Sequence, residues 1–204
     1  DPLADFTKVD CVTFVEQSIA LAASRSYPEA FDTLQRIRYR NGAIDFSQRN
    51  HFMLADWIPN NRFCRDVSRE VCPELQAVKR TIGRKHLFLS NHAPELADAV
   101  SDAPMEAAYI PVERVAAVEE KLPSPALICF IGKVDWLFVV HCGFYLQGED
   151  GQGRLIHASS KEGKVVETSL AGFVAQPGRY LGITAYAIDD PNGLKTDSGS
   201  SVDK

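Results

Sequence analysis

The chain has 204 residues, of which 45 % are apolar and 24 % are charged, as is usual for a globular protein. Its net charge of −5 argues against a nucleic acid as partner. No stretch approaches the roughly 18–20 apolar residues that a membrane-spanning helix needs.

Five cysteines are present, and their spacing bears on metals and disulfides: Cys11, Cys64, Cys72, Cys129 and Cys142. No two of them form a CxxC pair, so a zinc ribbon is not expected. Cys64 and Cys72 either form a disulfide in an oxidising compartment or are two ordinary thiols. We expect no metal and no cofactor.

Two helices are predicted near the start of the chain. The first spans Asp10–Ala23, with Asp10 as a good N-cap residue. Its apolar residues follow helical spacing: Val12, Val15, Ile19 and Ala22. The second runs from Pro28 to about Arg40, with Gly42 as the stop signal.

Residues 41–122 give a mixed pattern, which we interpret as an insertion of helices and loops. Polar and aromatic residues fill its first part, Pro59 to Asn61 marks a turn, and Glu113–Lys121 is typical of a short helix.

From Pro125 onward the pattern predicts β-strands, because β-branched and aromatic residues alternate with Gly-rich turns. The expected strands are Ala126–Ile131, Trp136–Leu146, Arg154–Ser159, Lys164–Thr168 and Tyr180–Ile188. Helices followed by an antiparallel sheet predict an α+β fold, with one domain over residues 1–189. The Ser/Gly/Asp/Lys-rich residues 190–204 are predicted to be disordered.

Cys11 is the candidate nucleophile, because it directly follows a helix N-cap. The N–H groups and the positive end of the helix dipole favour a thiolate there, whereas the neighbouring Asp10 carboxylate disfavours it. A base near the sulfur is therefore needed. His141, on the strand Trp136–Leu146, supplies one, since a histidine on a distant strand is typical of papain-like enzymes.

His157 is the candidate third residue, and its role depends on strand register. If the strands of His141 and His157 pair so that partner numbers add to about 300, His157 lies opposite Gly143 and diagonal to His141. A slip of one residue would turn His157 to the other face. In the favourable register His157 orients His141 and fixes its tautomer.

These residues resemble the NlpC/P60 cysteine peptidases, in particular the branch catalogued as domain of unknown function 1460. The resemblance rests on the segments Asp10–Glu16, His141–Leu146 and Leu155–Ser160, and on Tyr39–Gly42, Ser47–Phe52 and Asp56–Trp57. It implies a papain-like fold, with N-terminal helices packed on a central antiparallel sheet and residues 41–122 lining the substrate groove.

The same resemblance implies hydrolysis of a peptidoglycan amide through a Cys11–His141–His157 triad and a thioester. N-acetylmuramoyl-L-alanine is the favoured bond, and the γ-D-glutamyl–diaminopimelate bond is the alternative. The implied partners are peptidoglycan or muropeptide fragments, and the implied location is periplasmic or secreted, although no leader is visible.

Four further residues are candidates for substrate binding. Asp10 can bind a peptide amine or simply cap its helix. Arg49 and His51 can contact a carboxylate or sugar, or be solvated loop residues. Trp57 can stack on a sugar ring or be buried.

Two other classes of protein stay open from the residues alone. Cys11, His141 and His157 would also suit zinc as ligands, which predicts a metalloenzyme. A non-catalytic module that binds peptidoglycan without cleaving it is the second alternative.

Overall fold

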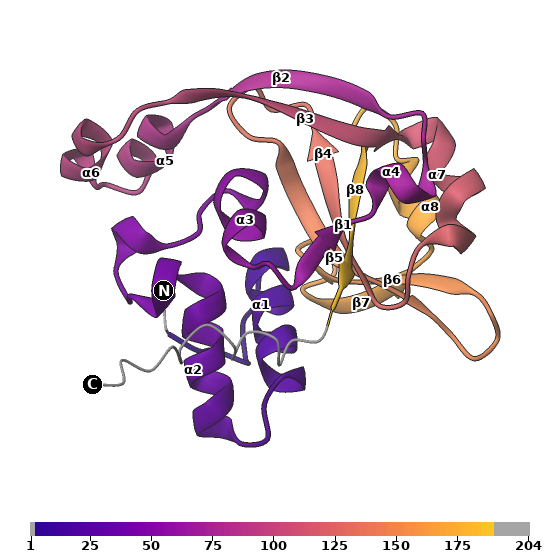
Figure 1. The fold of residues 1–204 in the computed structure, drawn as a ribbon, viewed down its shortest axis with the longest axis horizontal. Helices are drawn as coiled ribbons and strands as arrows, with labels where there is room; N and C mark the ends of the chain where they lie inside the picture. Colours follow the sequence, from indigo (N-terminus) through magenta and orange to yellow (C-terminus); the bar gives the residue numbers. More distant parts are fainter. Residues whose placement is uncertain (1–2, 190–204) are drawn as a thin grey trace, which may run out of the picture.

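The computed structural model describes residues 3–189, so the predicted disordered tail at 190–204 lies outside the described residues. Helices and an antiparallel sheet are mixed in it (Figure 1). Helices α1 and α2 lie to one side of the sheet, and α7 and α8 lie on the other (Figure 1).

Helix α1 spans Cys11–Ala22 and begins where the sequence predicts. Asp10 is its N-cap: the carboxylate accepts a hydrogen bond from the Thr13 N–H at 2.7 Å, and the Thr13 hydroxyl accepts one from the Asp10 N–H at 2.8 Å. Its buried face carries Val15 and Ile19, but also the polar Glu16 and Gln17.

Helix α2 spans Tyr27–Arg38, with the Ser26 hydroxyl accepting from the Glu29 N–H. It ends four residues before the predicted stop at Gly42. The reason is that Tyr39 is extended and pairs with Arg49 in an isolated β-bridge.

The sheet has eight strands in the described residues, all paired antiparallel. The order is β2-β3-β8-β4-β5-β6-β7, and β1 pairs with β8. The bounds are β1 Cys64–Asp66, β2 Gln76–Ile82, β3 Ala103–Pro111, β4 Ala126–Gly132, β5 Val139–Gln147, β6 Gly153–Ser159, β7 Lys164–Thr168 and β8 Tyr180–Ile188.

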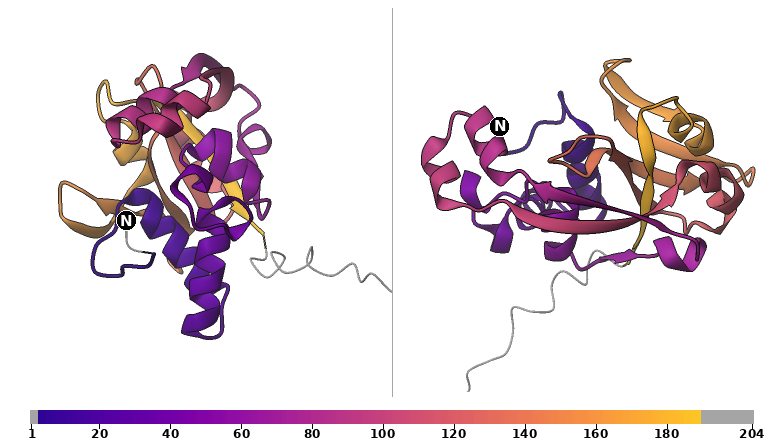
Figure 2. Two further views of the ribbon diagram at one scale, coloured as in Figure 1. Left: turned by 90° about the vertical axis from the view of Figure 1, so that its left-hand side faces the viewer. Right: turned by 90° about the horizontal axis from the view of Figure 1, so that it is seen from above.

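The interpretation of residues 41–122 as an insertion of helices and loops is wrong, because β1, β2 and β3 come from it. β1 and β3 both pair with β8, at the heart of the same sheet. β2 does not show the alternation of apolar and polar residues that usually indicates a strand. Most of its residues are exposed or half-buried, because it lies at the edge of the sheet and pairs with β3. The β2–β3 ladder extends sideways and carries α5 and α6 at its far end (Figure 2).

The remaining helical segments are short. They are η1 Arg40–Gly42, η2 Phe46–Gln48, the π-helical turn η3 Met53–Trp57, α3 Ile58–Asn60, α4 Ser68–Val71, α5 Arg84–Ser90, α6 Pro94–Ala99, α7 Val112–Val118, η4 Glu119–Lys121 and α8 Leu170–Val174. The predicted helix Glu113–Lys121 is thus confirmed as α7 followed by a 3₁₀ turn.

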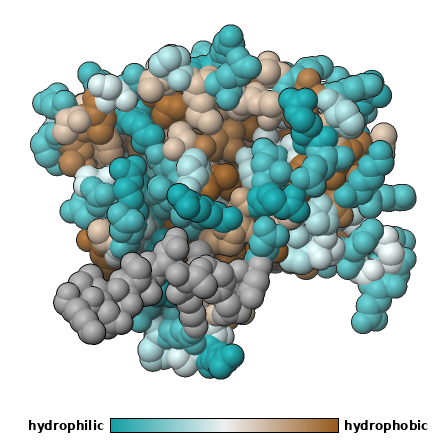
Figure 3. Space-filling view, in the orientation of Figure 1, coloured by the Kyte–Doolittle hydropathy of each residue, from teal (hydrophilic) through white to brown (hydrophobic). Residues whose placement is uncertain are grey.

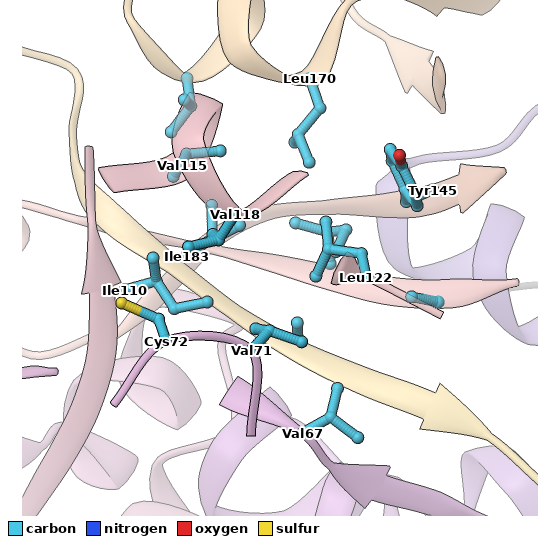
Figure 4. Packing of buried hydrophobic residues seen from close by; sticks show 14 of the residues in the cluster. Val67, Val71, Cys72, Ile110, Val115, Val118, Leu122, Tyr145, Leu170 and Ile183 are labelled. Carbon is cyan, nitrogen blue, oxygen red and sulfur yellow. The ribbon is translucent and has the colours of Figure 1, made fainter. Parts of the chain in front are cut away.

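Each face of the sheet has its own core. On one face Val115, Val118 and Leu170 of α7 and α8 pack on strand residues such as Ile110 and Ile183 (Figure 4). On the other, Val15 and Ile19 of α1 and Leu34 of α2 pack on Leu127, Cys129 and Cys142. Burial of these side chains is the main driving force for docking the helices.

Cys64 and Cys72 fall into these two different cores, and all five cysteines are free thiols. The disulfide alternative is therefore not observed. Cys129 is fully buried in the core.

The surface is mainly hydrophilic on the face seen in Figure 1. Apolar residues show at its centre and around the end that carries α5 and α6 (Figure 3). Among the described residues, no helix combines the length and apolar character required to span a bilayer.

Candidate active site

Cys11 is the first residue of α1, and its side chain is half-buried against the sheet. Helix α1 has twelve residues, so its free N–H groups and dipole favour negative charge at this end. A thiolate of Cys11 would therefore be stabilised by the backbone before any side chain is considered.

The strand register brings the two histidines together. In the β5–β6 ladder Phe144 pairs with Ile156 and Tyr145 with Leu155, so partner numbers add to 300 as predicted. Nε2 of His141 lies 2.9 Å from Nδ1 of His157, with the rings edge to face at 88°. One histidine thus hydrogen-bonds the other.

Gly143 makes this approach possible. A methyl group added at its Cα would come within 2.7 Å of the Ile156 carbonyl oxygen and 2.8 Å of the His157 Cβ. Only a residue without a side chain lets β6 lie this close to β5.

The pKa of Cys11 is lowered to about 5. A hydrogen bond with the Cys142 side chain contributes most, and a hydrogen bond with His141 and its charge add to it, while burial opposes them. Cys11 is therefore a thiolate at neutral pH, in contact with His141.

His157 is only 2 % exposed, and its pKa is lowered by burial and by the charge of His141. It is therefore neutral at neutral pH. When His141 is protonated beside the thiolate, its Nε2–H donates to Nδ1 of His157, which fixes the plane of the His141 ring.

Aromatic rings pack against the two histidines on the side of α8. The Phe173 ring lies 5.4 Å from that of His141 and 4.5 Å from that of His157, and Phe130 also packs on His141. Arg179 lies over the rings of Phe173 and Tyr180. Phe173 could not be identified from the sequence, because the short helix α8 carries no catalytic motif.

Asp10 is exposed and lines a cavity of about 300 Å³ beside the start of α1. Lys8, Thr13, Gln17 and Arg38 also line it. One oxygen of Asp10 serves as the helix cap, as the capping alternative requires. The residues that line the cavity do not include Cys11, His141 or His157, and the binding role of Asp10 stays a prediction.

Trp57 is fully buried, and its indole N–H donates to Glu16 at 3.1 Å. The prediction that it stacks on a sugar is therefore wrong. Glu16 on the buried face of α1 needs a hydrogen-bond donor inside the core, and the indole of Trp57 supplies one.

Arg49 and His51 are half-buried and lie in the segment between η2 and the π-turn. Arg49 pairs with Tyr39 in the isolated bridge. The His51 ring nitrogen lies 2.8 Å from the Phe46 carbonyl oxygen, and its ring packs edge to face on Phe88 of α5. These contacts serve the scaffold, and a role in binding stays a prediction for both residues.

No three His, Cys, Asp or Glu side chains converge as a metal site would over the described part of the chain. Cys11, His141 and His157 instead form a sequential chain of contacts. Chemically, a thiolate beside an imidazole that is oriented by a second imidazole is suited to attack a carbonyl group and then to protonate a leaving group.

Comparisons with known proteins point to one family. The family model described as AmiA-like, N-acetylmuramoyl-L-alanine amidase-like, matches residues 1–180. No protein with a curated description matches the chain.

Several solved structures share the fold. A Legionella pneumophila protein, LPG0564, of the family called DUF1460, has a TM-score of 0.75 at 20 % identity, over 88 % of this chain and 75 % of its own. A Bacteroides fragilis protein described as a putative xylanase has a TM-score of 0.71 at 29 % identity, over 91 % and 89 %. A Bacteroides uniformis N-acetylmuramoyl-L-alanine amidase has a TM-score of 0.68 at 26 % identity, over 89 % and 84 %.

Proposed function

Because the chain belongs to the N-acetylmuramoyl-L-alanine amidase-like family, we propose that it is a cysteine amidase that hydrolyses an amide bond of peptidoglycan. The observation that carries the cysteine mechanism is the chain of contacts from Cys11 through His141 to His157. Its fold would be that of the papain-like NlpC/P60 enzymes, and with such a substrate it would work in the periplasm or outside the cell.

The reaction has two halves. The Cys11 thiolate attacks the amide carbonyl carbon, the C–N bond breaks, and the Nδ1 proton of His141 passes to the leaving nitrogen, which leaves a thioester. Water then attacks the thioester while His141 takes its proton, and the acid and the Cys11 thiolate are released. His157 accepts a hydrogen bond from His141 throughout and keeps its ring in plane.

The oxyanion formed in each half needs donors. The backbone N–H of Cys11, at the first position of α1, is the candidate donor, and such a donor is typically worth about 3–4 kcal/mol.

For the substrate we favour the bond between the muramoyl group and L-alanine, in line with the described activity of the B. uniformis neighbour. Asp10 would face the peptide side from the cavity beside α1, and Arg49 and His51 are further candidate contacts. The similarity to a putative xylanase does not favour glycosidase chemistry, which uses a pair of carboxylates rather than a thiol and two imidazoles.

The test is incubation of the wild-type protein and Cys11→Ala with defined disaccharide-peptide muropeptides, with products identified by mass spectrometry. Free disaccharide plus an intact stem peptide, absent with the variant, is the expected result. A fragment cut after D-Glu would assign the γ-D-glutamyl–diaminopimelate bond to the same triad. Binding without cleavage would make the protein a peptidoglycan-binding module, and equal cleavage by the variant would refute the cysteine mechanism.

A further inference from the structure

Cys142 lies against the candidate nucleophile. Its Sγ is 3.3 Å from the carbonyl oxygen of Cys11, to which the thiol donates. Its side chain is 0 % exposed and belongs to the core between α1 and the sheet. Alternation turns Cys142 and His141 to opposite faces of β5. Both contact Cys11.

The thiol of Cys142 has one proton and two possible acceptors on Cys11. It donates to the carbonyl oxygen when Cys11 is a neutral thiol. Once Cys11 ionises, its sulfur becomes the better acceptor, because hydrogen bonds to a charged group are about twice as strong as those between neutral groups. A hydrogen bond between the two side chains is the largest cause of the lowered pKa of Cys11.

Burial decides which of the two sulfurs carries the charge. The hydrogen bond with Cys11 and complete burial raise the pKa of Cys142 well above that of an ordinary thiol. Cys142 therefore stays a donor at every pH at which the protein would work. Cys11 is half-buried, at a helix N-terminus and next to His141, so it is the sulfur that ionises.

Other ionisable groups around the pair do not replace this donor. Asp10 is an anion on the neighbouring residue, and Cys129 and Tyr180 are buried groups whose pKa values are raised, in part by the charge of Cys11. His157 is neutral and hydrogen-bonds His141 rather than Cys11.

We propose that Cys142 is a positioning residue for the amidase reaction, an inference that rests on the proposed function: its buried thiol donates a hydrogen bond to the Cys11 thiolate, keeps it ionised and fixes its sulfur between α1 and β5. The donor offsets the unfavourable charge of Asp10, so that the nucleophile does not depend on His141 alone.

The experiment compares the pH dependence of Cys11 alkylation by iodoacetamide in the wild-type protein, Cys142→Ser and Cys142→Val. The rate is followed by mass spectrometry of the peptide that contains Cys11. Ser keeps a donor, whereas Val has no donor and is one heavy atom larger than Cys. The wild-type inflection is expected near pH 5. The inflection of Cys142→Ser should remain close to the wild-type value. That of Cys142→Val should lie about one pH unit higher, which means a roughly tenfold loss of alkylation rate at acidic pH.

An unchanged inflection in Cys142→Val would overturn the proposal, and so would an equal shift in the Ser and Val variants, which would indicate packing alone. Thermal unfolding checks that each variant is folded, and Cys142→Ala replaces Val if that variant is not. The assay contains no peptidoglycan, so its result is independent of the proposed function. If the wild-type protein leaves muropeptides intact but the inflection of Cys142→Val shifts as expected, the amidase assignment is overturned. The hydrogen bond from Cys142 to the Cys11 thiolate then still stands.

Discussion

At the level of single residues, the proposed mechanism has His157 act only through His141. His157 is buried, neutral and 2.9 Å from Nε2 of His141. Its proposed contribution is therefore the orientation and tautomer of the base, and not proton transfer to the substrate.

We expect His157→Ala to lower kcat/KM on muropeptides by about 10²-fold or more, because an unoriented base loses much of the gain from general acid–base catalysis. His157→Gln keeps a hydrogen-bonding group and should retain more activity than His157→Ala. Steady-state kinetics of both variants, with thermal unfolding as a control, check this. Wild-type kcat/KM in His157→Ala would show that His141 needs no such partner.

The lowered pKa of Cys11 predicts how activity depends on pH. The thiolate is present above about pH 5 and is lost as the pH falls through that value. The acidic limb of kcat/KM should therefore have its midpoint near pH 5. A rate profile in overlapping buffers measures it. Activity that rises only toward the ordinary thiol pKa of 9.0 would contradict the assignment of a thiolate.

Cys11, His141 and His157 could be singled out from the sequence, because they lie on elements with clear local patterns. The contact of Cys142 with Cys11 could not be predicted, since alternation shows only that Cys142 faces away from His141. The prediction for Trp57 was wrong, because an aromatic residue in a polar segment gives no indication that Glu16, forty-one positions earlier, is its partner.

At the level of elements, a buried polar network joins α1 to α2. Glu16 accepts from the Arg38 guanidinium at 2.9 Å and from the Trp57 indole at 3.1 Å, and both charged side chains are 1–2 % exposed. Burial raises the pKa of Glu16 in spite of Arg38. The network sets the position of α1, and hence of Cys11, relative to the rest of the chain.

Removing the positive charge of Arg38 should therefore destabilise the folded protein. We expect Arg38→Met to lower the free energy of unfolding by about 3–5 kcal/mol, because Glu16 is left buried without its charged partner. Arg36→Met, on the exposed side of the same helix, is the matched control and should change stability by no more than about 0.5 kcal/mol. Urea unfolding measures both, and equal stability of the two variants would show that the network does not hold the helices.

The β5–β6 pair depends on Gly143. Gly143→Ala should push β6 away from β5, separate His141 from His157, and cost about 1–3 kcal/mol through overpacking. Activity should fall further than the loss of stability explains.

Gly172→Ala in α8 is the control for this change, because its added methyl group would meet only Ser169 atoms at an ordinary 3.5 Å. Unfolding curves and kcat/KM of the two variants are compared side by side. Full activity in Gly143→Ala would show that the close approach of the strands is not needed.

At the level of the whole molecule, α1 and α2 lie to one side of the sheet (Figure 1). Cys11 comes from α1, and the two histidines come from β5 and β6 of the sheet. The five C-terminal strands were predictable, because each follows alternation or an apolar run. Strands β1, β2 and β3, within residues 41–122, were not predictable. β1 has only three residues, and β2 is polar and lies at the edge of the sheet. Their identity depends on pairing with β3 and β8, which are distant in the sequence.

The central claim is that Cys11 forms a thioester with the acyl part of a muropeptide. Rapid acid quenching during turnover, followed by mass spectrometry of the intact protein and of the peptide containing Cys11, tests it directly. We predict a mass increase on Cys11 equal to the disaccharide acyl group without the stem peptide. Steady release of products while Cys11 stays unmodified at every quench time would contradict the account.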